Sequence, residues 1–309
     1  MEVSVVVATH AMFRYSDLRD AVESVLAQTY GQVELVVVVD GTDAVADRAR
    51  REFGDRESVR VHCLPENRGV SAARTHGAEL ATGDVVAFLD DDAVANPDWI
   101  ERLVTAYDDH GALAVGGRMT GDWHSGRPWY LPTEFDWLVG VTYPGFAEAG
   151  AEVRNTFESN LSVRRDVFLD LDGFDPDLGP TADRYRHGEG AAFGDRLRAE
   201  HGRGVIYAPD AVVEHNVFEY RTRPGFLARR AFQQGVSKRR LGRSSDTPGG
   251  TDSTESNYLG WLLQDRVPRR LRGIVESTSV RALGELLALA LLTGIVGLGY
   301  LWGWLEELG

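Results

Sequence analysis

The 309-residue chain has little of two residue types, since it contains one cysteine, Cys63, and one lysine, Lys238. A single cysteine excludes an intramolecular disulfide and any metal or iron–sulfur site built from several cysteines. Acidic residues outnumber basic ones 47 to 33, which gives a formal net charge of −14. Because contact with nucleic-acid phosphates depends on basic surface, this balance argues against a general nucleic-acid-binding protein. An acidic, lysine-poor composition is typical of proteins from a salt-rich cytoplasm.

Two glycine-rich phosphate-binding motifs are also missing. No G-x-G-x-x-G follows the first apolar run, residues 3–8, and no G-x-x-x-x-G-K-[ST] occurs in the chain. Their absence disfavours a dinucleotide oxidoreductase and a P-loop ATPase. No basic region precedes the first apolar run, so the sequence does not predict a signal peptide.

The charge is distributed unevenly. Residues 1–220 carry a net charge of −19, residues 221–272 carry +8, and residues 273–309 carry −3. Residues 286–305 are 20 uncharged, mostly apolar residues, and at ~1.5 Å per residue they match a ~30 Å hydrocarbon layer. We expect a C-terminal transmembrane helix; the alternative is a buried helix of a soluble domain. Arginines precede this run and Glu306 and Glu307 follow it, so the positive-inside rule predicts a single-pass cell-membrane protein with everything upstream of the helix in the cytoplasm.

Between residue 220 and that run lie three further segments. Apolar and basic residues alternate over residues 221–243, which indicates either a basic amphipathic helix on a membrane surface or an ordinary solvated helix. Residues 244–256 are rich in Ser, Thr and Gly and are predicted to form a flexible linker. Residues 257–285 are the expected juxtamembrane segment.

The first half of the chain has an α/β pattern. Continuous apolar runs at residues 3–8, 33–39, 59–64 and 85–89 predict strands buried on both faces of a parallel sheet. Helical patterns separate them, at residues 17–28, 44–53 and 71–80. This alternation predicts a Rossmann-like, doubly wound, mostly parallel sheet, whose ligand site lies at the carboxyl ends of the strands.

Three consecutive carboxylates, Asp90, Asp91 and Asp92, follow the fourth predicted strand. Like charges so close together are costly unless a cation neutralises them. Mg²⁺ and Mn²⁺ prefer oxygen ligands and bind phosphate oxygens at the same time. The triplet therefore suits a metal-bound nucleotide diphosphate; the alternative is a solvated acidic turn.

Residues 66–93, ENRGVSAARTHGAELATGDVVAFLDDDA, resemble the GT-A-fold glycosyltransferases of family 2. The pattern of that family runs N-x-G-x-x-x-A-R-N-x-G and continues through a Gly-acid pair to an Asp-x-Asp strand. The residues that match it are Asn67, Gly69, Ala73, Arg74, Gly77, Gly83, Asp84, Asp90 and Asp92. Thr75 replaces the second Asn. The resemblance covers residues 3–216 and implies a GT-A domain over residues 1–220.

The resemblance also implies roles for individual residues. Asp92 and His215 are the expected ligands of Mg²⁺ or Mn²⁺, and Arg74 is expected to face the diphosphate. The implied nucleotide-sugar-binding residues are Thr9, Asp40, Asn67, Arg74, Asp90, Asp91 and Asn160. Thr9 and Asp40 would contact uracil and ribose, and Asn160 would line the sugar pocket.

The catalytic base is where the chain departs from the family pattern. The family has Glu-Asp where this sequence has Glu189-Gly190, and the missing Asp normally deprotonates the acceptor hydroxyl. We expect Glu189 to be the base, because one carboxylate near the acceptor suffices for general-base catalysis. Asp183 and Asp195 are the alternatives.

Taken together, the resemblance implies an inverting, metal-dependent glycosyltransferase that uses a UDP-sugar. It is closest to haloarchaeal hexuronic-acid transferases, which act on dolichyl-phosphate-linked sugars in S-layer N-glycosylation. The implied donor is UDP-glucuronate and the implied acceptor a dolichyl-phosphate-linked hexose. Membrane lipid and other glycosyltransferases of the pathway are the expected partners. Two alternatives stay open: a hexosyltransferase that forms a dolichyl-phosphate sugar directly, and a non-catalytic sugar-nucleotide-binding scaffold protein.

Overall fold

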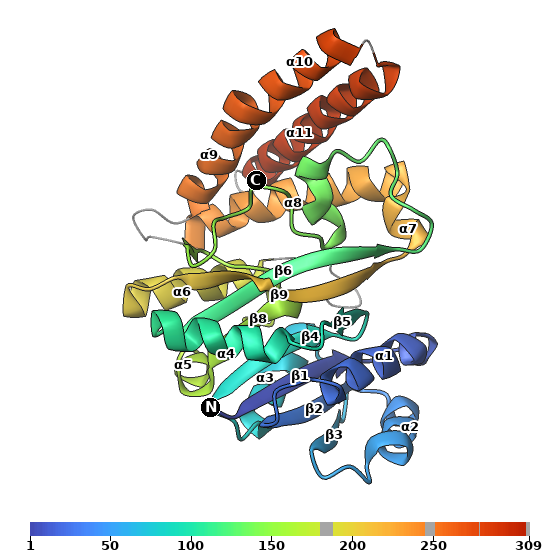
Figure 1. Ribbon diagram of the computed structural model, residues 1–309, viewed down its shortest axis with the longest axis vertical. Coiled ribbons are helices and arrows are strands. Elements are labelled where there is room, and N and C mark those ends of the chain that lie inside the picture. The colour runs from blue at the N-terminus through green and yellow to red at the C-terminus, as the bar shows by residue number, and fades with distance from the viewer. Residues whose placement is uncertain (180–187, 245–250, 278, 307–309) are drawn as a thin grey trace. The chain divides into compact units, whose positions relative to one another are not determined.

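The structure is a computed structural model that describes residues 1–179, 188–244, 251–277 and 279–306 (Figure 1). The chain forms two compact units. The first unit consists of Met1–Thr120 and Ala147–His215, and the second of Gly121–Phe146 and Asn216–Gly309. Asp183, one of the alternative bases, lies outside the described residues.

The first unit begins with four parallel strands. They are β1 (Val3–Thr9), β2 (Val33–Asp40), β3 (Val59–Leu64) and β4 (Val85–Asp90), in the spatial order β3-β2-β1-β4. The helices between them are α1 (Tyr15–Leu26), α2 (Asp43–Phe53) and α3 (Val70–Leu80), and a 3₁₀ turn, η1 (Met12–Arg14), precedes α1. The predicted α/β alternation is confirmed.

The same sheet continues beyond β4 with antiparallel strands. The order is β8 (Leu161–Arg164), β6 (Ala114–Trp123), β9 (Val205–Val217) and β5 (Ala93–Ala95), and β7 (Glu152–Val153) pairs with β9. The remaining elements of the unit are α4 (Trp99–His110), the 3₁₀ turn η3 (Glu158–Asn160), α5 (Arg165–Asp170) and α6 (Glu189–His201). The sheet is thus parallel over β1–β4 and antiparallel beyond.

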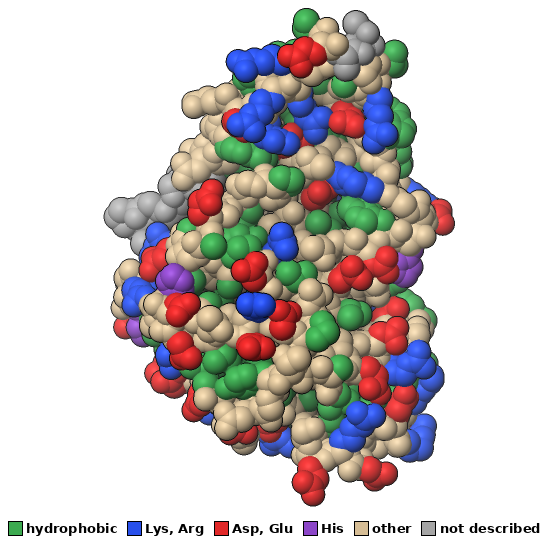
Figure 2. Space-filling model, in the orientation of Figure 1, with side chains coloured by type: hydrophobic (Ala, Val, Ile, Leu, Met, Phe, Trp, Pro, Cys, Tyr) green, Lys and Arg blue, Asp and Glu red, His purple; other side chains and the backbone are tan. Residues whose placement is uncertain are grey.

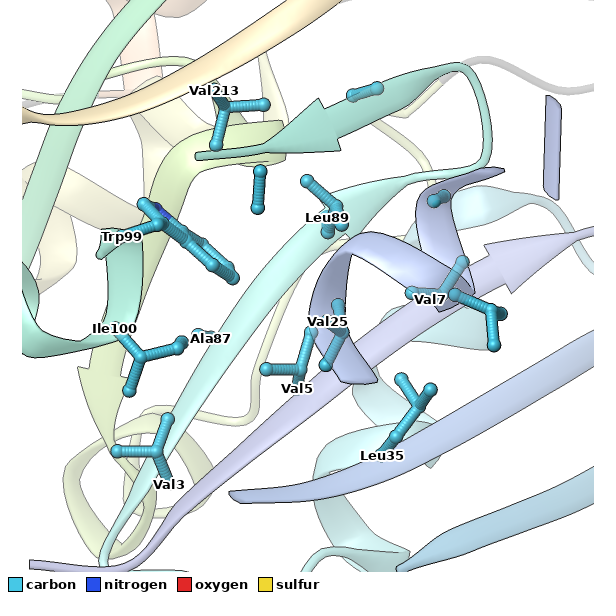
Figure 3. Close-up of a cluster of buried hydrophobic side chains, with 14 of the residues drawn as sticks. Val3, Val5, Val7, Val25, Leu35, Ala87, Leu89, Trp99, Ile100 and Val213 are labelled. Carbon is cyan, nitrogen blue, oxygen red and sulfur yellow. The ribbon is translucent and has the colours of Figure 1, made fainter. Parts of the chain in front are cut away.

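Both faces of the sheet are buried, which explains the unbroken apolar runs. Val3, Val5 and Val7 of β1 join one cluster with Trp99 and Ile100 of α4 (Figure 3). Val6 and Phe88 point to the other face, where they join a second cluster with the rings of Phe168, Phe174 and Phe193. Alternation of side chains along each strand divides the residues between these clusters. Full burial contributes roughly 1.5–3 kcal/mol for each large apolar side chain.

The second unit is helical. Besides the ends of β6 and β9, it contains η2 (Thr133–Val139), α7 (Glu219–Thr222), α8 (Pro224–Ser244), α9 (Thr251–Trp261), one π turn η4 (Leu262–Arg266), α10 (Val267–Ser277) and α11 (Val280–Glu306). Its core combines Phe135 of η2 with Leu227 and Ala231 of α8 and Leu289 and Leu292 of α11.

The second unit differs from the sequence-based expectation at two places. The apolar residues Leu227, Ala231 and Leu241 of the expected membrane-surface helix are buried inside the protein, because η2 and α11 cover that face. The segment expected to be a linker, residues 244–256, is helical from Thr251.

Acidic and basic side chains are interspersed on the face drawn in Figure 2, so the net negative charge is not gathered in one patch there. Within the described residues, α11 is the one helix long and apolar enough to cross a membrane, with a mean hydropathy of 1.9. The apolar helix expected at residues 286–305 is therefore present and extends from Val280 to Glu306.

Candidate functional site

Polar side chains gather at the carboxyl edge of the parallel strands. Thr9 ends β1, Asp40 ends β2 and Asp90 ends β4. In the sheet register, Ala8 pairs with Asp90 and Thr9 pairs with Val39, so these strand ends are neighbours. Asp91 and Asp92 follow in the turn before β5. The structure thus places four of the expected donor-binding residues, Thr9, Asp40, Asp90 and Asp91, on one edge of the sheet.

Asp40 fixes the loop that enters α3. Its two carboxylate oxygens accept hydrogen bonds from the backbone N–H groups of Arg68 (2.7 Å) and Gly69 (2.8 Å), and Asn67 Nδ2 donates to the Asp40 carbonyl (3.3 Å). Gly69 precedes the helix with φ of 90°, a value that glycine adopts readily. Burial raises the pKa of Asp40 in spite of these hydrogen bonds. Asp40 and Asn67 therefore shape this loop.

Asp91 and Asp92 are buried, and both carboxylates contact the guanidinium group of Arg14. Thr9 Oγ1 donates to Asp91 (2.6 Å), and Arg14 Nη1 lies 2.9 Å from Asp92 Oδ2 and 3.4 Å from Asp91 Oδ1. Burial, followed by the charge of Asp92, raises the pKa of Asp91 to about 7. Sequence reasoning missed Arg14. Its position in η1, directly after the first strand, was the available signal.

Asp92 also faces His215 of β9. Its Oδ1 lies 3.5 Å from His215 Nε2, and the two residues are 3% and 5% exposed. The pairing of Ala93 with His215 between β5 and β9 sets this approach. The antiparallel part of the sheet therefore joins two residues that are 123 positions apart in the chain.

The pair Asp92–His215 fits a divalent cation by its donor types. A carboxylate oxygen and an imidazole nitrogen are both ligands of Mn²⁺, and carboxylate also suits Mg²⁺. Among the described residues, no three His, Cys, Asp or Glu side chains form a group that could hold a metal by themselves. Such an ion would thus take its remaining ligands from diphosphate oxygens and water.

A second cluster centres on Arg74 of α3. This nearly fully buried guanidinium bonds to the Asp90 carboxylate, and its Nη1 lies 3.7 Å from Glu189 Oε1. Within the described residues, Arg74 Nε is buried and has no hydrogen-bond partner. A buried donor without a partner is costly, and a phosphate oxygen is a strong acceptor for it. This supports the diphosphate-facing role expected for Arg74.

Glu189 begins α6 and is 3% exposed. It accepts the backbone N–H of Gly188 (3.0 Å). Burial raises the pKa of Glu189, the nearby Glu158 carboxylate raises it further, and the Arg74 charge opposes the shift. Glu189 is thus a buried carboxyl group whose pKa is raised above the usual range of a glutamate.

Glu158 is a member of this cluster that sequence reasoning missed. Its Oε1 accepts the backbone N–H of Gly190 (3.0 Å), and burial raises the pKa of Glu158. A Cβ atom on Gly190 would meet the same Oε1 at 2.1 Å. The Glu158 carboxylate therefore occupies the space into which a side chain at position 190 would extend. The absence of a side chain at position 190 thus goes together with the Glu158 carboxylate that fills this space. Asn160, two residues after Glu158, was the available signal.

Asn160, the residue expected in the sugar pocket, has a fully buried side chain that bonds at both ends. Its Oδ1 accepts Trp99 Nε1 (2.8 Å), and its Nδ2 donates to the carbonyls of Arg118 (3.1 Å) and Ala211 (2.9 Å). The amide thus ties α4, β6 and β9 together. Its neighbour Ser159 accepts the Asp90 N–H (3.0 Å), which holds the end of β4 in place.

Asp195, the other described alternative base, lies six residues beyond Glu189 on α6. At ~1.5 Å rise and ~100° per residue, the two Cα atoms are ~9 Å apart along the axis and on different faces. Of the two, Glu189 is the one that reaches Arg74.

Comparisons with known proteins agree with this arrangement. A family model described as glycosyl transferase family 2 matches residues 4–172. The chain is 46% identical over 304 residues to the glucosyl-dolichyl phosphate glucuronosyltransferase of Haloferax volcanii, a match that covers 98% of this chain and 96% of the relative.

Two solved structures resemble the chain in fold. The mannosyltransferase PcManGT of Pyrobaculum calidifontis, in complex with GDP-Man and Mn²⁺, aligns with a TM-score of 0.61 at 18% identity, over 97% of this chain and 87% of that one. Residues 1–349 of S. aureus TarS, in complex with UDP-GlcNAc, align with a TM-score of 0.57 at 18% identity, over 96% and 82%. The expected GT-A fold is confirmed.

Proposed function

The chain belongs to glycosyl transferase family 2 and is a glycosyltransferase, and from that premise we propose that it transfers glucuronic acid from UDP-glucuronate to a dolichyl-phosphate-linked hexose. The observation that carries this choice of donor and acceptor is the near full-length similarity to a relative named for that activity. The paired clusters around Asp92 and Arg74 at the strand ends supply the chemistry that such a transfer needs.

In the proposed mechanism, Asp92 and His215 would hold Mg²⁺ or Mn²⁺, which when bound would supply positive charge to offset the charge that develops on the departing diphosphate. Arg74 donates charge-assisted hydrogen bonds to the same group. Asp90 holds the Arg74 guanidinium in place from the end of β4.

Glu189 is the proposed base. It accepts the proton of the acceptor hydroxyl while that oxygen attacks the anomeric carbon and the bond to the diphosphate breaks. This single in-line displacement inverts the anomeric configuration and forms no covalent intermediate with the protein. Burial of the Glu189 carboxyl supports the role, because a raised pKa makes the carboxylate a stronger base.

The proposed location is the cytoplasmic face of the cell membrane. The proposed acceptor is anchored in lipid, and α11 supplies an apolar helix for attachment. The remaining proposed donor-site residues are Thr9, Asp40, Asn67, Asp90 and Asp91, with Asn160 acting through the packing around them.

The test is an incubation of membranes containing the protein with a panel of labelled UDP-sugars. The acceptors are dolichyl phosphate and glucosyl-dolichyl phosphate, each with and without EDTA. We expect label from UDP-glucuronate alone, on the glucosylated lipid alone, and abolished by EDTA. Label on dolichyl phosphate itself would contradict the proposed acceptor, and label from another UDP-sugar would contradict the proposed donor.

A further inference from the structure

Helix α11 has two opposite apolar faces. Leu289, Leu292, Gly299 and Gly303 are buried within the second unit. Eight exposed apolar residues lie along the other side of the helix, most of them at three- or four-residue spacing, which is the spacing of a single stripe. They are Val280, Leu283, Leu287, Leu291, Leu298, Leu301, Trp302 and Leu305. Tyr300 and Trp304, near the end of the helix, are exposed on the side of the buried residues.

Helix α8 lies along the buried face of α11. A Cβ atom on Gly235 would meet the carbonyl oxygen of Val296 at 2.0 Å, and one on Gly299 would meet the carbonyl oxygen of Phe232 at 2.0 Å. Farther along the pair, Arg240 Nη2 lies 2.9 Å from Glu306 Oε2. The two backbones are thus in close contact, and α8 accompanies the apolar run of α11 to its end.

Helix α8 carries five cationic side chains in this stretch. Arg229 and Arg230 lie on the helical turn between Leu227 and Ala231, whose side chains are buried. Lys238, Arg239 and Arg240 lie alongside the last turns of α11. If α11 crossed a bilayer with its contacts intact, α8 would take these charges, except that of Arg240 beside Glu306, into the hydrocarbon layer. Charged side chains there are expensive, and detaching α11 would expose the core around Leu289.

Two arginines that the positive-inside rule would count have partners inside the second unit. Buried Glu134 lies 3.0 Å from Arg266 Nε and 2.6 Å from Arg270 Nη2, and Tyr258 donates to the Glu134 carbonyl (2.7 Å). These contacts tie α9 and α10 to η2. The arginines therefore serve the packing of this unit, which weakens them as a signal for a crossing helix.

From these contacts we infer that α11 lies in the plane of the membrane surface, with its exposed stripe in the lipid, and does not cross the bilayer. The partner of this exposed apolar stripe is a lipid bilayer that contains anionic headgroups. Leu271 and Val275 on α10 are exposed as well. Arg269 and Arg281 have side chains 67% and 70% exposed, and each also pairs with a carboxylate four residues away. On the face shown in Figure 2, basic side chains with acidic ones among them lie over α10. An apolar stripe flanked by basic residues is the pattern of helices that lie on membranes.

The inference rests on the proposed membrane attachment and is tested by the sidedness of the two ends of α11. In a Cys63→Ser background, one variant carries Ser279→Cys and another carries a cysteine appended after Gly309. Sealed vesicles of each orientation are treated with a membrane-impermeant maleimide. We expect both cysteines to be labelled from the same side. Labelling from opposite sides would show a crossing helix and overturn the inference.

Binding to vesicles provides the second test. The triple variant Leu287→Gln, Leu291→Gln, Leu298→Gln is expected to lose at least tenfold in affinity for vesicles with anionic lipid, while its melting temperature stays near that of the wild type. Phe13→Ser, at a position 84% exposed in the first unit, is the matched control and should bind normally. Unchanged binding of the folded triple variant would overturn the inference. Transfer to a short-chain, water-soluble acceptor tests the proposed function separately, because it needs no membrane.

Discussion

Replacing Glu189 by Gln tests the proposed catalytic base most directly. Gln is nearly isosteric and keeps an oxygen that accepts the Gly188 N–H, but it cannot take a proton. A positioned general base contributes typically 10²- to 10⁴-fold to a rate. We therefore expect Glu189→Gln to lower kcat by that factor, equivalent to about 3–5 kcal/mol of lost transition-state stabilisation.

Donor binding should change little in the same variant. Arg74 loses a partner 3.7 Å away but retains its bond to Asp90. Isothermal titration with UDP and Mn²⁺ is the measurement, and a change of less than threefold in Kd is expected. Glu200→Gln, at an exposed position on the same helix, is the matched control and should leave both kcat and Kd unchanged.

The pH profile separates a base from a structural residue. The pKa of Glu189 is raised by burial and by Glu158, so the carboxyl is protonated and inactive up to a pH above the usual range of a glutamate. The kcat of the wild type should accordingly rise as the pH increases through that raised pKa, and this limb should vanish in Glu189→Gln. A Glu189→Gln variant with the kcat of the wild type would refute the assignment of Glu189 as the catalytic base. A comparable loss in Glu158→Gln alone would move the base role to Glu158.

Three further predictions concern the cations and carboxylates of the two units. Asp92→Asn should lose both turnover and metal-dependent donor binding, as measured by labelled transfer and by titration with UDP in the presence of Mn²⁺; unchanged metal-dependent binding would contradict its role as a ligand. Arg14→Met removes a charge-assisted bond of about 1.5–3 kcal/mol from Asp92, so donor-free protein should bind Mn²⁺ at least tenfold more tightly by electron paramagnetic resonance. An unchanged affinity would contradict this competition. Glu134→Gln leaves Arg266 and Arg270 without their buried counter-charge and should destabilise the protein by about 3 kcal/mol in urea unfolding, the lower end of the usual range because Arg270 keeps Glu285; an unchanged midpoint would contradict it.

The sequence predicted the parallel half of the sheet well. Apolar runs buried on both faces have no polar alternation, and the sequence therefore predicts β1–β4 to within one residue of their bounds. Because parallel strands end at one edge, Thr9, Asp40 and Asp90 could be placed together from their positions alone. The family motif added Arg74 and His215, which periodicity by itself does not connect.

The sequence could not predict which polar side chains form hydrogen bonds or ion pairs with each other inside the protein. Asn160 matched a binding motif, yet its amide ties three elements together. Arg14 and Glu158 matched no motif, yet they face Asp92 and Gly190. Such partnerships depend on side-chain directions from elements distant in the chain, and local spacing carries no information about them.

By itself, then, the sequence determined the α/β alternation, the acidic strand end, the family and an apolar C-terminal helix. Each of these can be inferred from the composition and spacing of residues that are close together in the chain. Only the tertiary structure decided that Arg14 reaches Asp92, that Glu158 fills the space beside Gly190, and that α8 covers one face of α11. The physical reason is common to all three: burial and charge pairing depend on what covers a side chain, and the covering residues come from elsewhere in the chain.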